Sequence, residues 1–428
     1  MRMRIRNELP NPGATRATMK SRSVLSCWLI LSLGCVPALE ASDLSYRAEF
    51  HARFVPEEHV AIVRITIDQT AGELRALNFA ASSERFSGFS GEGAGDGEIV
   101  RDGDRVLWRV PRQGGSLRYR VVVDKERNGA LDARLNESGA IVRLGDLFPP
   151  ARVRSRVGAV SESLVRLAGP AGWSFETRYG AAAEARTVID PARRFDRPTG
   201  WAVAGKLGIR RDRIVDRRIA IAAPVVGAGA EARFRRMDML AFLRWTLPTF
   251  TEVFTNFPER LLIVGAGNGM WRGGLAGPAS LYLHTGRPLI SENGTSALLH
   301  ELVHVVTFGP AAERDDWVVE GLAEYYSLEI LRRTDGISQR RFDTAIASLA
   351  EWAANEDGGP AEPSTGANTA WAVGKLHALA AELEAAGSSL DAVVRVLVEN
   401  KTLNYSMLKR QAELELGREA TALAVIGG

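Results

Sequence analysis

The sequence of 428 residues has only two cysteines, Cys27 and Cys35, and both lie near its N-terminus. We expect this N-terminal segment to be removed, so the mature protein would have no cysteine. A cysteine-free exported protein cannot use disulfides. Its stability must come from its hydrophobic core, and the chain is long enough to bury one.

An excess of charge of either sign is also lacking. The chain has 54 Lys and Arg against 51 Asp and Glu, a formal net charge of +3. Its hydrophobic content of 46% and charged content of 25% are ordinary for a soluble globular protein. The basic residues are mostly Arg, and no Arg cluster is interleaved with aromatic residues. The composition therefore predicts no nucleic-acid partner.

No hydrophobic run is long enough for a comfortable membrane span. The most apolar stretch, residues 24–36, follows Lys20 and is shorter than a spanning helix needs. Small residues come next, at Ala38 and Ala41, as in a signal-peptide cleavage site. We therefore expect residues 1–41 to be a signal peptide. The product would be periplasmic or secreted, with no membrane span in the mature chain.

Two alternatives remain for this N-terminal segment. It could stay attached as an uncleaved anchor. The sequence Ser-Leu-Gly-Cys at residues 32–35 loosely resembles a bacterial lipobox, which would make the protein a lipoprotein. The lipoprotein is the less favoured alternative, because Ser32 stands where an aliphatic residue is expected.

Histidine is scarce, with six in the whole chain, yet two stand four residues apart in His300-Glu301-Leu302-Val303-His304. Apolar residues flank this H-E-x-x-H motif and predict a helix, on which positions i and i+4 share one face. Two imidazoles so placed can bind one Zn²⁺, and Glu301 can act as general base. The alternative is a surface helix with two solvated histidines.

A second helix is expected to begin at residues 315–326, with the sequence Asp-Asp-Trp-Val-Val-Glu-Gly-Leu-Ala-Glu-Tyr-Tyr. Glu320 fits a third metal ligand, which would leave a fourth position for water. Glu324, one turn later, fits a carboxylate that accepts the outer N–H of a ligating histidine. A solvated surface role is the alternative for Glu324. We predict one Zn²⁺ per chain, on His300, His304 and Glu320.

The two motifs together resemble the gluzincin metallopeptidases. H-E-x-x-H followed by W-x-x-E-G-x-A-E-Y-Y is most similar to the glycyl aminopeptidase family and, more distantly, to the aminopeptidase N family. The segment 273–280, Gly-Gly-Leu-Ala-Gly-Pro-Ala-Ser, resembles the G-G-L-E-H segment before the zinc helix of the glycyl aminopeptidases. The resemblance implies a zinc peptidase acting on a peptide or protein substrate, with Gly273, Gly274 and Ala276 on the substrate side.

The chain departs from the family pattern at two positions. Ala276 replaces the Glu whose equivalent in the aminopeptidase N family binds a free α-amine, and Glu292 is the residue that could supply a carboxylate instead. Trp371 aligns with the family's transition-state Tyr. Tyr325 and Tyr326 are further candidate donors, although each could have a packing role.

These departures leave two functions open. The first is an exported zinc peptidase that hydrolyses peptide bonds with a metal-activated water and is not a strict aminopeptidase. The second is a catalytically weak or inactive protein that binds zinc and a peptide or protein partner. The intact general base favours the first function, and the missing Glu and Tyr favour the second.

The fold is expected to be α+β. Residues 42–225 alternate as strands do and predict a β-rich N-terminal region, with a Gly- and Ser-rich loop at 86–103. Residues 226–428 predict a mainly helical, gluzincin-type catalytic domain with strands at 261–264 and 280–283. Besides the two zinc-site helices, helical spacing is found at 231–254 (interrupted by Pro248), 342–354, 368–386, 390–398 and 406–416.

Overall fold

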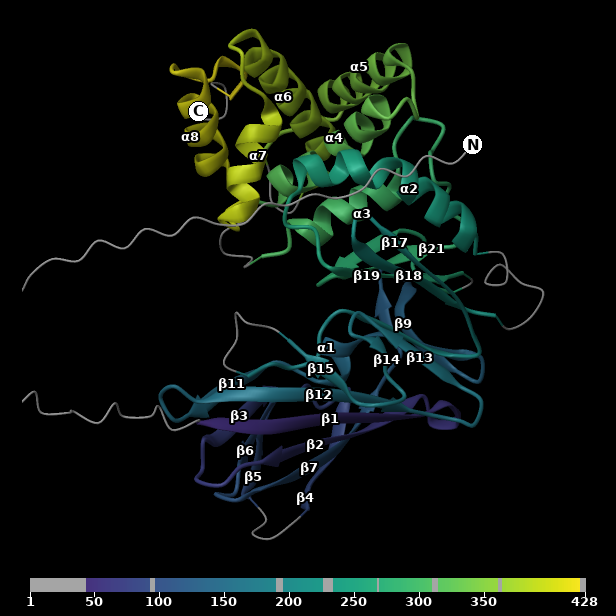
Figure 1. The fold of residues 1–428 in the computed structure, drawn as a ribbon, viewed down its shortest axis with the longest axis vertical. Coiled ribbons are helices and arrows are strands. Elements are labelled where there is room, and N and C mark those ends of the chain that lie inside the picture. The colour runs from purple at the N-terminus through teal and green to yellow at the C-terminus, as the bar shows by residue number, and fades with distance from the viewer. Residues whose placement is uncertain are drawn as a thin grey trace, which may run out of the picture. The chain divides into compact units, whose positions relative to one another are not determined.

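The computed structural model describes residues 44–92, 97–189, 195–225, 234–267, 269–309, 315–360 and 364–423. The predicted signal peptide lies outside these ranges, as does the predicted start of a helix at 231–233. A β-rich region is followed by a mainly helical one, which confirms the predicted α+β class (Figure 1). Within the described ranges, no helix is long and apolar enough to cross a membrane.

Three sheets build the β-rich region. The first has six strands, in the order β15 (Arg186–Val188), β12 (Val160–Ala168), β1 (Ser45–Val55), β2 (Val60–Asp68), β7 (Gly114–Val122) and β4 (Phe86–Glu92). The second has the order β14 (Gly180–Ala181), β13 (Ser174–Thr177), β16 (Trp201–Gly205), β10 (Gly139–Arg143), β9 (Ala130–Asn136) and β8 (Lys125–Arg127). The third has the order β11 (Ala151–Ser155), β3 (Leu74–Ala80), β6 (Arg105–Arg109) and β5 (Ile99–Asp102).

Alternation along β1 places its apolar side chains in the core of this region. Tyr46, Phe50 and Phe54 are at most 2% exposed, whereas Arg47 and Arg53 face outward. This is the pattern of a strand with one buried face. A short 3₁₀ turn (Pro56–Glu58) follows β1, and the short helix α1 (Leu144–Leu147) follows β10.

The prediction of a loop over 86–103 is wrong, because β4 and β5 form there. β4 is an edge strand that pairs with β7, and its register shifts between Ser87 and Ser90. β5 pairs with β6 at another edge. Edge strands tolerate glycine and serine when a neighbour supplies the hydrogen bonds, so pairing outweighs the low strand propensity of this segment.

A fourth sheet carries the helical region. Its order is β17 (Leu207–Ile214), β18 (Arg217–Pro224), β19 (Arg260–Ala266), β21 (Ser280–His284) and β20 (Gly274–Gly277). β18, β19 and β21 are parallel, and β20 is an antiparallel edge strand. The predicted strands at 261–264 and 280–283 are confirmed. The sheet takes strands from both sides of residue 225, where the predicted domain boundary stays a prediction.

The helices pack on this sheet and on one another, and Figure 1 shows α2 and α3 next to it. Their bounds are α2 (Arg236–Val253), α3 (Ala297–Val306), α4 (Asp316–Arg333), α5 (Gln339–Asn355), α6 (Gly366–Ala385), α7 (Leu390–Glu399) and α8 (Tyr405–Leu416), with a 3₁₀ turn at Thr421–Leu423.

Pro248 does not interrupt α2, which contradicts the sequence prediction. Its neighbours Leu247, Phe250 and Val253 are fully buried in the core of the helical region. Tertiary packing supplies most of the stability of a protein helix. Here it outweighs the hydrogen bond that proline removes.

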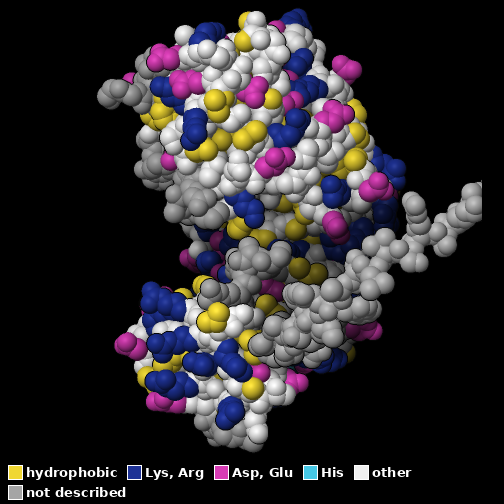
Figure 2. Space-filling model, turned by 60° about the vertical axis from the view of Figure 1, so that its left-hand side comes forward, with side chains coloured by type: hydrophobic (Ala, Val, Ile, Leu, Met, Phe, Trp, Pro, Cys, Tyr) yellow, Lys and Arg dark blue, Asp and Glu magenta, His cyan; other side chains and the backbone are white. Residues whose placement is uncertain are grey.

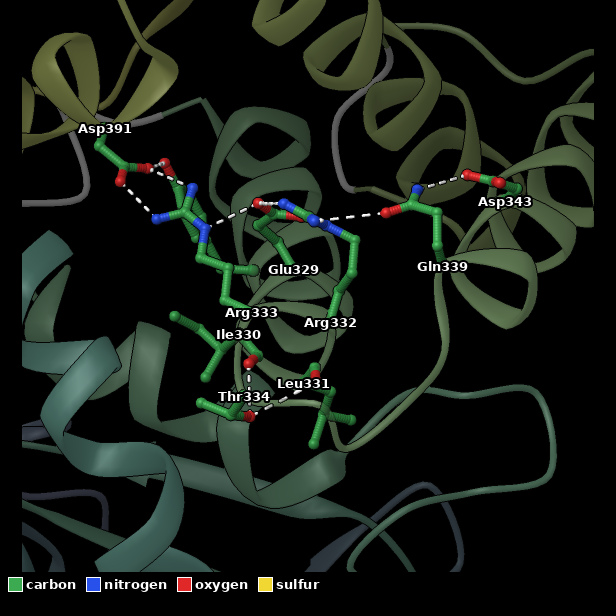
Figure 3. A network of polar contacts seen from close by, with 10 residues as sticks. Glu329, Ile330, Leu331, Arg332, Arg333, Thr334, Gln339, Asp343 and Asp391 are labelled. Carbon is green, nitrogen blue, oxygen red and sulfur yellow. Dashed lines mark hydrogen bonds and ion pairs between the residues drawn. The ribbon is translucent and has the colours of Figure 1, made fainter.

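The C-terminal end of α4 is fixed by a network of charged side chains (Figure 3). Glu329, only 3% exposed, accepts hydrogen bonds of 2.7 Å from Arg332 Nη2 and Arg333 Nε. Arg333 Nη2 also donates to Asp391 Oδ1 on α7 over 3.0 Å, and Tyr326 donates to the same oxygen. The network links α4 to α7 and so fixes the helix that carries Glu320 and Glu324.

Charged side chains cover the molecule unevenly. In the view of Figure 2, Lys and Arg side chains gather over the β-rich region, whereas both signs are interspersed over the helices. Several arginines of the β-rich region form ion pairs, including Arg64 with Glu92 and Arg120 with Glu58. Such pairing is consistent with a chain whose total charge is close to balance.

Candidate active site

Helices α3 and α4 bring the H-E-x-x-H motif against Glu320. Ser296 caps α3 by accepting a hydrogen bond from the Leu299 N–H, and His300 and His304 follow on one face of that helix. Their Nε2 atoms lie 3.0 Å apart. The Glu320 carboxylate oxygens lie 3.4 Å from His300 Nε2 and 3.4 Å from His304 Nε2. Two imidazole nitrogens and a carboxylate thus converge on one point.

This donor set fits a zinc ion. Zinc takes imidazole and carboxylate ligands at about 2.0–2.2 Å in a tetrahedral arrangement, which separates two ligand atoms by about 3.4 Å. The three separations around His300, His304 and Glu320 are close to that value. Within the described residues, these three form the one group of His, Cys, Asp or Glu side chains that converge closely enough to hold a metal ion.

Glu324 orients the first histidine. Its Oε2 lies 3.0 Å from His300 Nδ1, so the Nδ1 proton of His300 faces a carboxylate and Nε2 faces Glu320. Burial lowers the pKa of His300, but its hydrogen bonds to Glu320 and Glu324 outweigh burial and raise it to about 10. The raised pKa of His300 indicates a negative electrostatic potential at this position. A metal cation can displace the proton from the imidazole when it binds.

Glu301 lies beside the two histidines and packs against β20. It is 8% exposed, and burial raises the pKa of its carboxyl group above the ordinary value. The backbone N–H of Ala276 donates to it, which partly opposes the effect of burial. Gly274 leaves room for it: a Cβ at Gly274 would lie 2.5 Å from Glu301 Oε1. Two residues of the segment 273–280 therefore hold the Glu301 carboxyl group: Ala276 by its backbone N–H and Gly274 by the space that its missing side chain leaves.

The site opens into a cleft of about 600 Å³. Glu301, Glu320 and Glu324 are the carboxylates among its lining residues. The described residues that line it are Arg127, Trp271, Gly273, Gly274, Leu275, Ala276, Arg287, Ser291, Asn293, Thr295, Ala297, His300, Glu301, His304, Phe308, Glu320 and Glu324.

Four predicted side chains lie elsewhere. Tyr326 is fully buried and donates to Asp391, and Tyr325 packs against it with ring centroids 5.3 Å apart. Trp371 packs against Trp317 at 5.3 Å and lines a different pocket, between α5 and α6. Glu292 is exposed and is not among the residues that line the cleft. The structure therefore brings none of the candidate transition-state donors to His300, His304 and Glu320.

The cleft also contains residues that the sequence did not single out. Arg127 comes from the β8–β9 hairpin of the β-rich region, far from the motif in sequence. Backbone bonds fasten this hairpin beside the cleft: Leu131 N donates to Gly269 O (2.9 Å), and Trp271 N donates to Leu131 O (2.7 Å). Trp271 lies two residues before the Gly-rich segment 273–280, and this position was the only sequence signal for it.

Solved structures with the same arrangement of elements are zinc metallopeptidases. An aminopeptidase N family protein from Idiomarina loihiensis matches 88% of this chain and 72% of its own, with 14% identity and a TM-score of 0.62. The M1 zinc metallopeptidase from Deinococcus radiodurans matches 89% of this chain and 92% of its own, with 17% identity and a TM-score of 0.57. A mutant of that enzyme, bound to the substrate Tyr-Ser-Ala, matches with 18% identity and a TM-score of 0.55.

The chain therefore has the fold of the M1 zinc metallopeptidases, and the resemblance to the aminopeptidase N family is confirmed at the level of structure. Comparison with protein-family models and with curated protein sequences gives no match. At a sequence identity below 20%, these similarities show a shared fold and do not by themselves show a shared function. The evidence for function is therefore the site itself.

Proposed function

We propose that this protein is a zinc-dependent peptidase that hydrolyses peptide bonds with water. The observation that carries the proposal is the convergence of His300, His304 and Glu320 beside the buried carboxyl group of Glu301, in an open cleft. A protein that had lost hydrolysis would have no chemical need for a base placed beside the ligands. The fold of the M1 zinc metallopeptidases supports the same class of reaction.

Each of these residues has a distinct role in the proposed reaction. His300, His304 and Glu320 would hold one zinc ion, and Glu324 keeps His300 in the tautomer that presents Nε2. When bound, zinc supplies Lewis acidity and lowers the pKa of a water to about 7. Glu301 takes the proton of the attacking water and passes it to the leaving amine, and its raised pKa suits both transfers.

The test measures zinc and hydrolysis together. Purified protein should contain one zinc per chain by elemental analysis, and should cleave members of a mixed peptide library in a chelator-sensitive way. Glu301→Gln should keep the zinc and lose about 10²- to 10⁴-fold in rate. A double variant, His300→Ala with His304→Ala, should lose the zinc. Equal activity of the wild type and Glu301→Gln would overturn the proposal.

We further propose that the enzyme is not a strict aminopeptidase. The carboxylates among the described lining residues are Glu301, Glu320 and Glu324, which are already used as base, zinc ligand and partner of His300. Ala276 offers no carboxylate for a substrate α-amine. The test compares free and N-acetylated forms of a cleaved peptide. Acetylation should leave cleavage largely intact. A complete loss at the first bond would show that an α-amine is required.

The second candidate is a protein that binds zinc and a peptide or protein partner with little turnover. The observation that favours it is that Tyr325, Tyr326 and Trp371 all lie outside the cleft. Tight peptide binding by zinc-loaded wild type without any cleavage would establish this candidate over the peptidase.

Export is a proposal that rests on sequence. We propose that residues 1–41 are removed and that the product is periplasmic or secreted, because a charged segment, an apolar run and small residues occur in that order. Sequencing of the mature N-terminus decides it. A start near residue 39 or 42 supports cleavage, a lipid on Cys35 indicates a lipoprotein, and an intact leader indicates an anchor.

A further inference from the structure

The cleft carries two positive charges that the proposed hydrolysis does not use. Arg127 and Arg287 both line it, whereas each lining carboxylate already has a proposed role: Glu320 as a zinc ligand, Glu324 as the partner of His300, and Glu301 as the base. Within the described ranges of the chain, neither guanidinium has a carboxylate within ion-pair distance. Both positive charges are therefore available to an anionic group of a ligand that enters the cleft.

Arg127 is held in place by the fold. Arg127 is the last residue of β8, in the β8–β9 hairpin. Backbone hydrogen bonds of Leu131 join this hairpin to the segment that carries Trp271. Its guanidinium carbon lies 5.7 Å from the centre of the Trp271 ring, a cation–π contact with another lining residue. Contact with the indole limits the positions that this long side chain can take, so its charge stays at the cleft.

Arg287 stands on a turn directly after β21. Its N–H donates to the His284 carbonyl over 3.0 Å, and the Gly286 N–H donates to His284 Nδ1 over 3.0 Å. Burial lowers the pKa of His284, and the charges of Arg272 and Arg287 lower it further. Arg287 therefore adds positive charge to this side of the cleft, and the neighbouring His284 is biased toward its neutral form.

The loop beside the zinc ligands adds the polar, uncharged side chains of Ser291, Asn293 and Thr295 to the lining. Arg341 fixes the loop beside the metal group through the carbonyls of Ser291 and Glu292, and Asn293 accepts two hydrogen bonds from Thr295. A fixed loop of this kind suits a peptide backbone. Apart from Glu301, Glu320 and Glu324, the described lining has no acid for an ammonium group, but it has two guanidinium groups whose planar forks match a carboxylate.

We propose that Arg127 and Arg287 bind a carboxylate of the substrate peptide, either its C-terminus or an acidic side chain. The proposal deepens the peptidase function and rests on it. It predicts an enzyme that selects peptides by a negative charge, in contrast to selection by a free α-amine.

The experiment uses one N-acetylated peptide with a single Asp and a free C-terminus, together with its Asn form, its C-terminal amide, and the form with both changes. Hydrolysis is measured with zinc-loaded wild type, and binding is measured by fluorescence anisotropy with zinc-loaded Glu301→Gln. We expect removal of the recognised carboxylate to weaken binding and raise KM by roughly 3- to 30-fold, with a smaller effect on kcat. The Asn form and the amide distinguish the two sources.

Arg127→Gln and Arg287→Gln should each reduce the preference for the charged peptide without changing zinc content. Arg154→Gln, on an exposed position of β11, is the matched control and should keep the preference. Equal binding of all four peptides, or a preference unchanged in both Arg variants, overturns the proposal. If binding discriminates while wild type cleaves nothing, the peptidase function fails and the carboxylate site stands.

Discussion

Gly274 on β20 lies so close to the Glu301 side chain that no room remains for a side chain at position 274. A Cβ added at Gly274 would lie 2.4 Å from Glu301 Cγ and 2.5 Å from Oε1, which is closer than real Cβ contacts allow. We expect Gly274→Ala to displace the carboxylate and to lower kcat by at least about 10-fold, since small displacements of catalytic groups are costly. The measurement is kcat together with zinc content, which should not change.

Gly374 provides the control for this substitution. It lies inside α6 with open space around the position of a Cβ. Gly374→Ala should leave activity unchanged and stabilise the fold by about 0.5–1 kcal/mol, because alanine is a better helix former. Full activity in Gly274→Ala would mean that Glu301 can act from another position.

Glu324 contacts His300 at Nδ1 and would affect a bound zinc ion through that histidine. We expect Glu324→Ala to weaken zinc binding by about 10- to 100-fold, because His300 loses the acceptor at Nδ1. Glu324→Gln keeps an acceptor without the charge and should lie between the two. Chelator competition measures the affinities. A titration of Glu324→Ala that superimposes on wild type would show that Glu324 is merely solvated.

The sequence predicted the site residues that lie close to one another along the chain. His300 and His304 share a helix face whatever the rest of the fold does, and Glu320 follows one short loop later. Arg127 could not be predicted, because only the pairing of a distant hairpin with the Trp271 segment brings it to the cleft. Trp371 was placed by an alignment to a family pattern, and helix packing takes it elsewhere.

Among the elements, α4 carries a buried charge at its C-terminal end. Glu329 is 3% exposed and bonded to Arg332 and Arg333. Glu329→Gln keeps the shape but leaves the Arg332 guanidinium without its counter-charge, whereas Arg333 keeps its ion pair with Asp391. We expect it to lower the free energy of unfolding by about 2 kcal/mol, less than for a fully buried pair because both arginines are partly exposed.

Urea unfolding measures the effect. Glu413→Gln is the control, because Glu413 pairs with Lys409 on the surface of α8, where such pairs contribute about 0.5 kcal/mol or less. An equal change in both variants would show that the α4 network is no more than a surface feature.

The 3₁₀ turn Thr421–Leu423 is fixed to α6 by Glu382. Burial raises the pKa of this carboxyl group, but the backbone N–H groups of Ala422 and Thr421, together with Arg418, outweigh burial and lower it to about 2. A depressed folded-state pKa adds stability above the unfolded value of 4.5, and this stability is lost as pH falls toward about 2.

We therefore expect Glu382→Gln to be less stable than wild type at pH 7, by about 2 kcal/mol, and the difference to shrink between about pH 5 and pH 2. Unfolding free energies across this pH range measure it. Glu384→Gln, on an exposed position of the same helix, should track wild type at every pH. A difference that stays constant with pH would assign the loss to packing.

The type of each element followed from its pattern when local and tertiary preferences agreed. The helices at 390–399 and 405–416 were predicted within one or two residues. Prediction failed at 86–103 and at Pro248, where local preference opposes the observed structure. Neighbouring strands in the first case, and a buried apolar face in the second, decided the outcome, and neither is visible in a local window.

Across the whole molecule, Trp201 joins the β-rich region to the site. It is fully buried, its Nε1 donates to Leu275 O on β20 over 2.8 Å, and its N–H donates to Ser280 Oγ over 2.8 Å. Trp201→Phe loses the indole bond and leaves a small cavity. We expect the free energy of unfolding to fall by about 2 kcal/mol, and kcat to fall as well because β20 also holds Glu301.

Trp173→Phe is the control in the same region. Trp173 is half-buried and packs near Phe54, away from β20, so this variant should keep full activity. Unchanged kcat in Trp201→Phe would show that β20 keeps its position without this hydrogen bond.

The five-stranded sheet has a consequence for attempts to produce the catalytic half alone. A fragment beginning at residue 226 would lack β17 and β18, and β19 would lose the strand that pairs with it from Arg218↔Arg260 to Ala222↔Val264. A long apolar strand with unpaired N–H and C=O groups is a template for other chains. Such a fragment would aggregate in the cell, whereas one beginning before Leu207 would keep the sheet closed on that side.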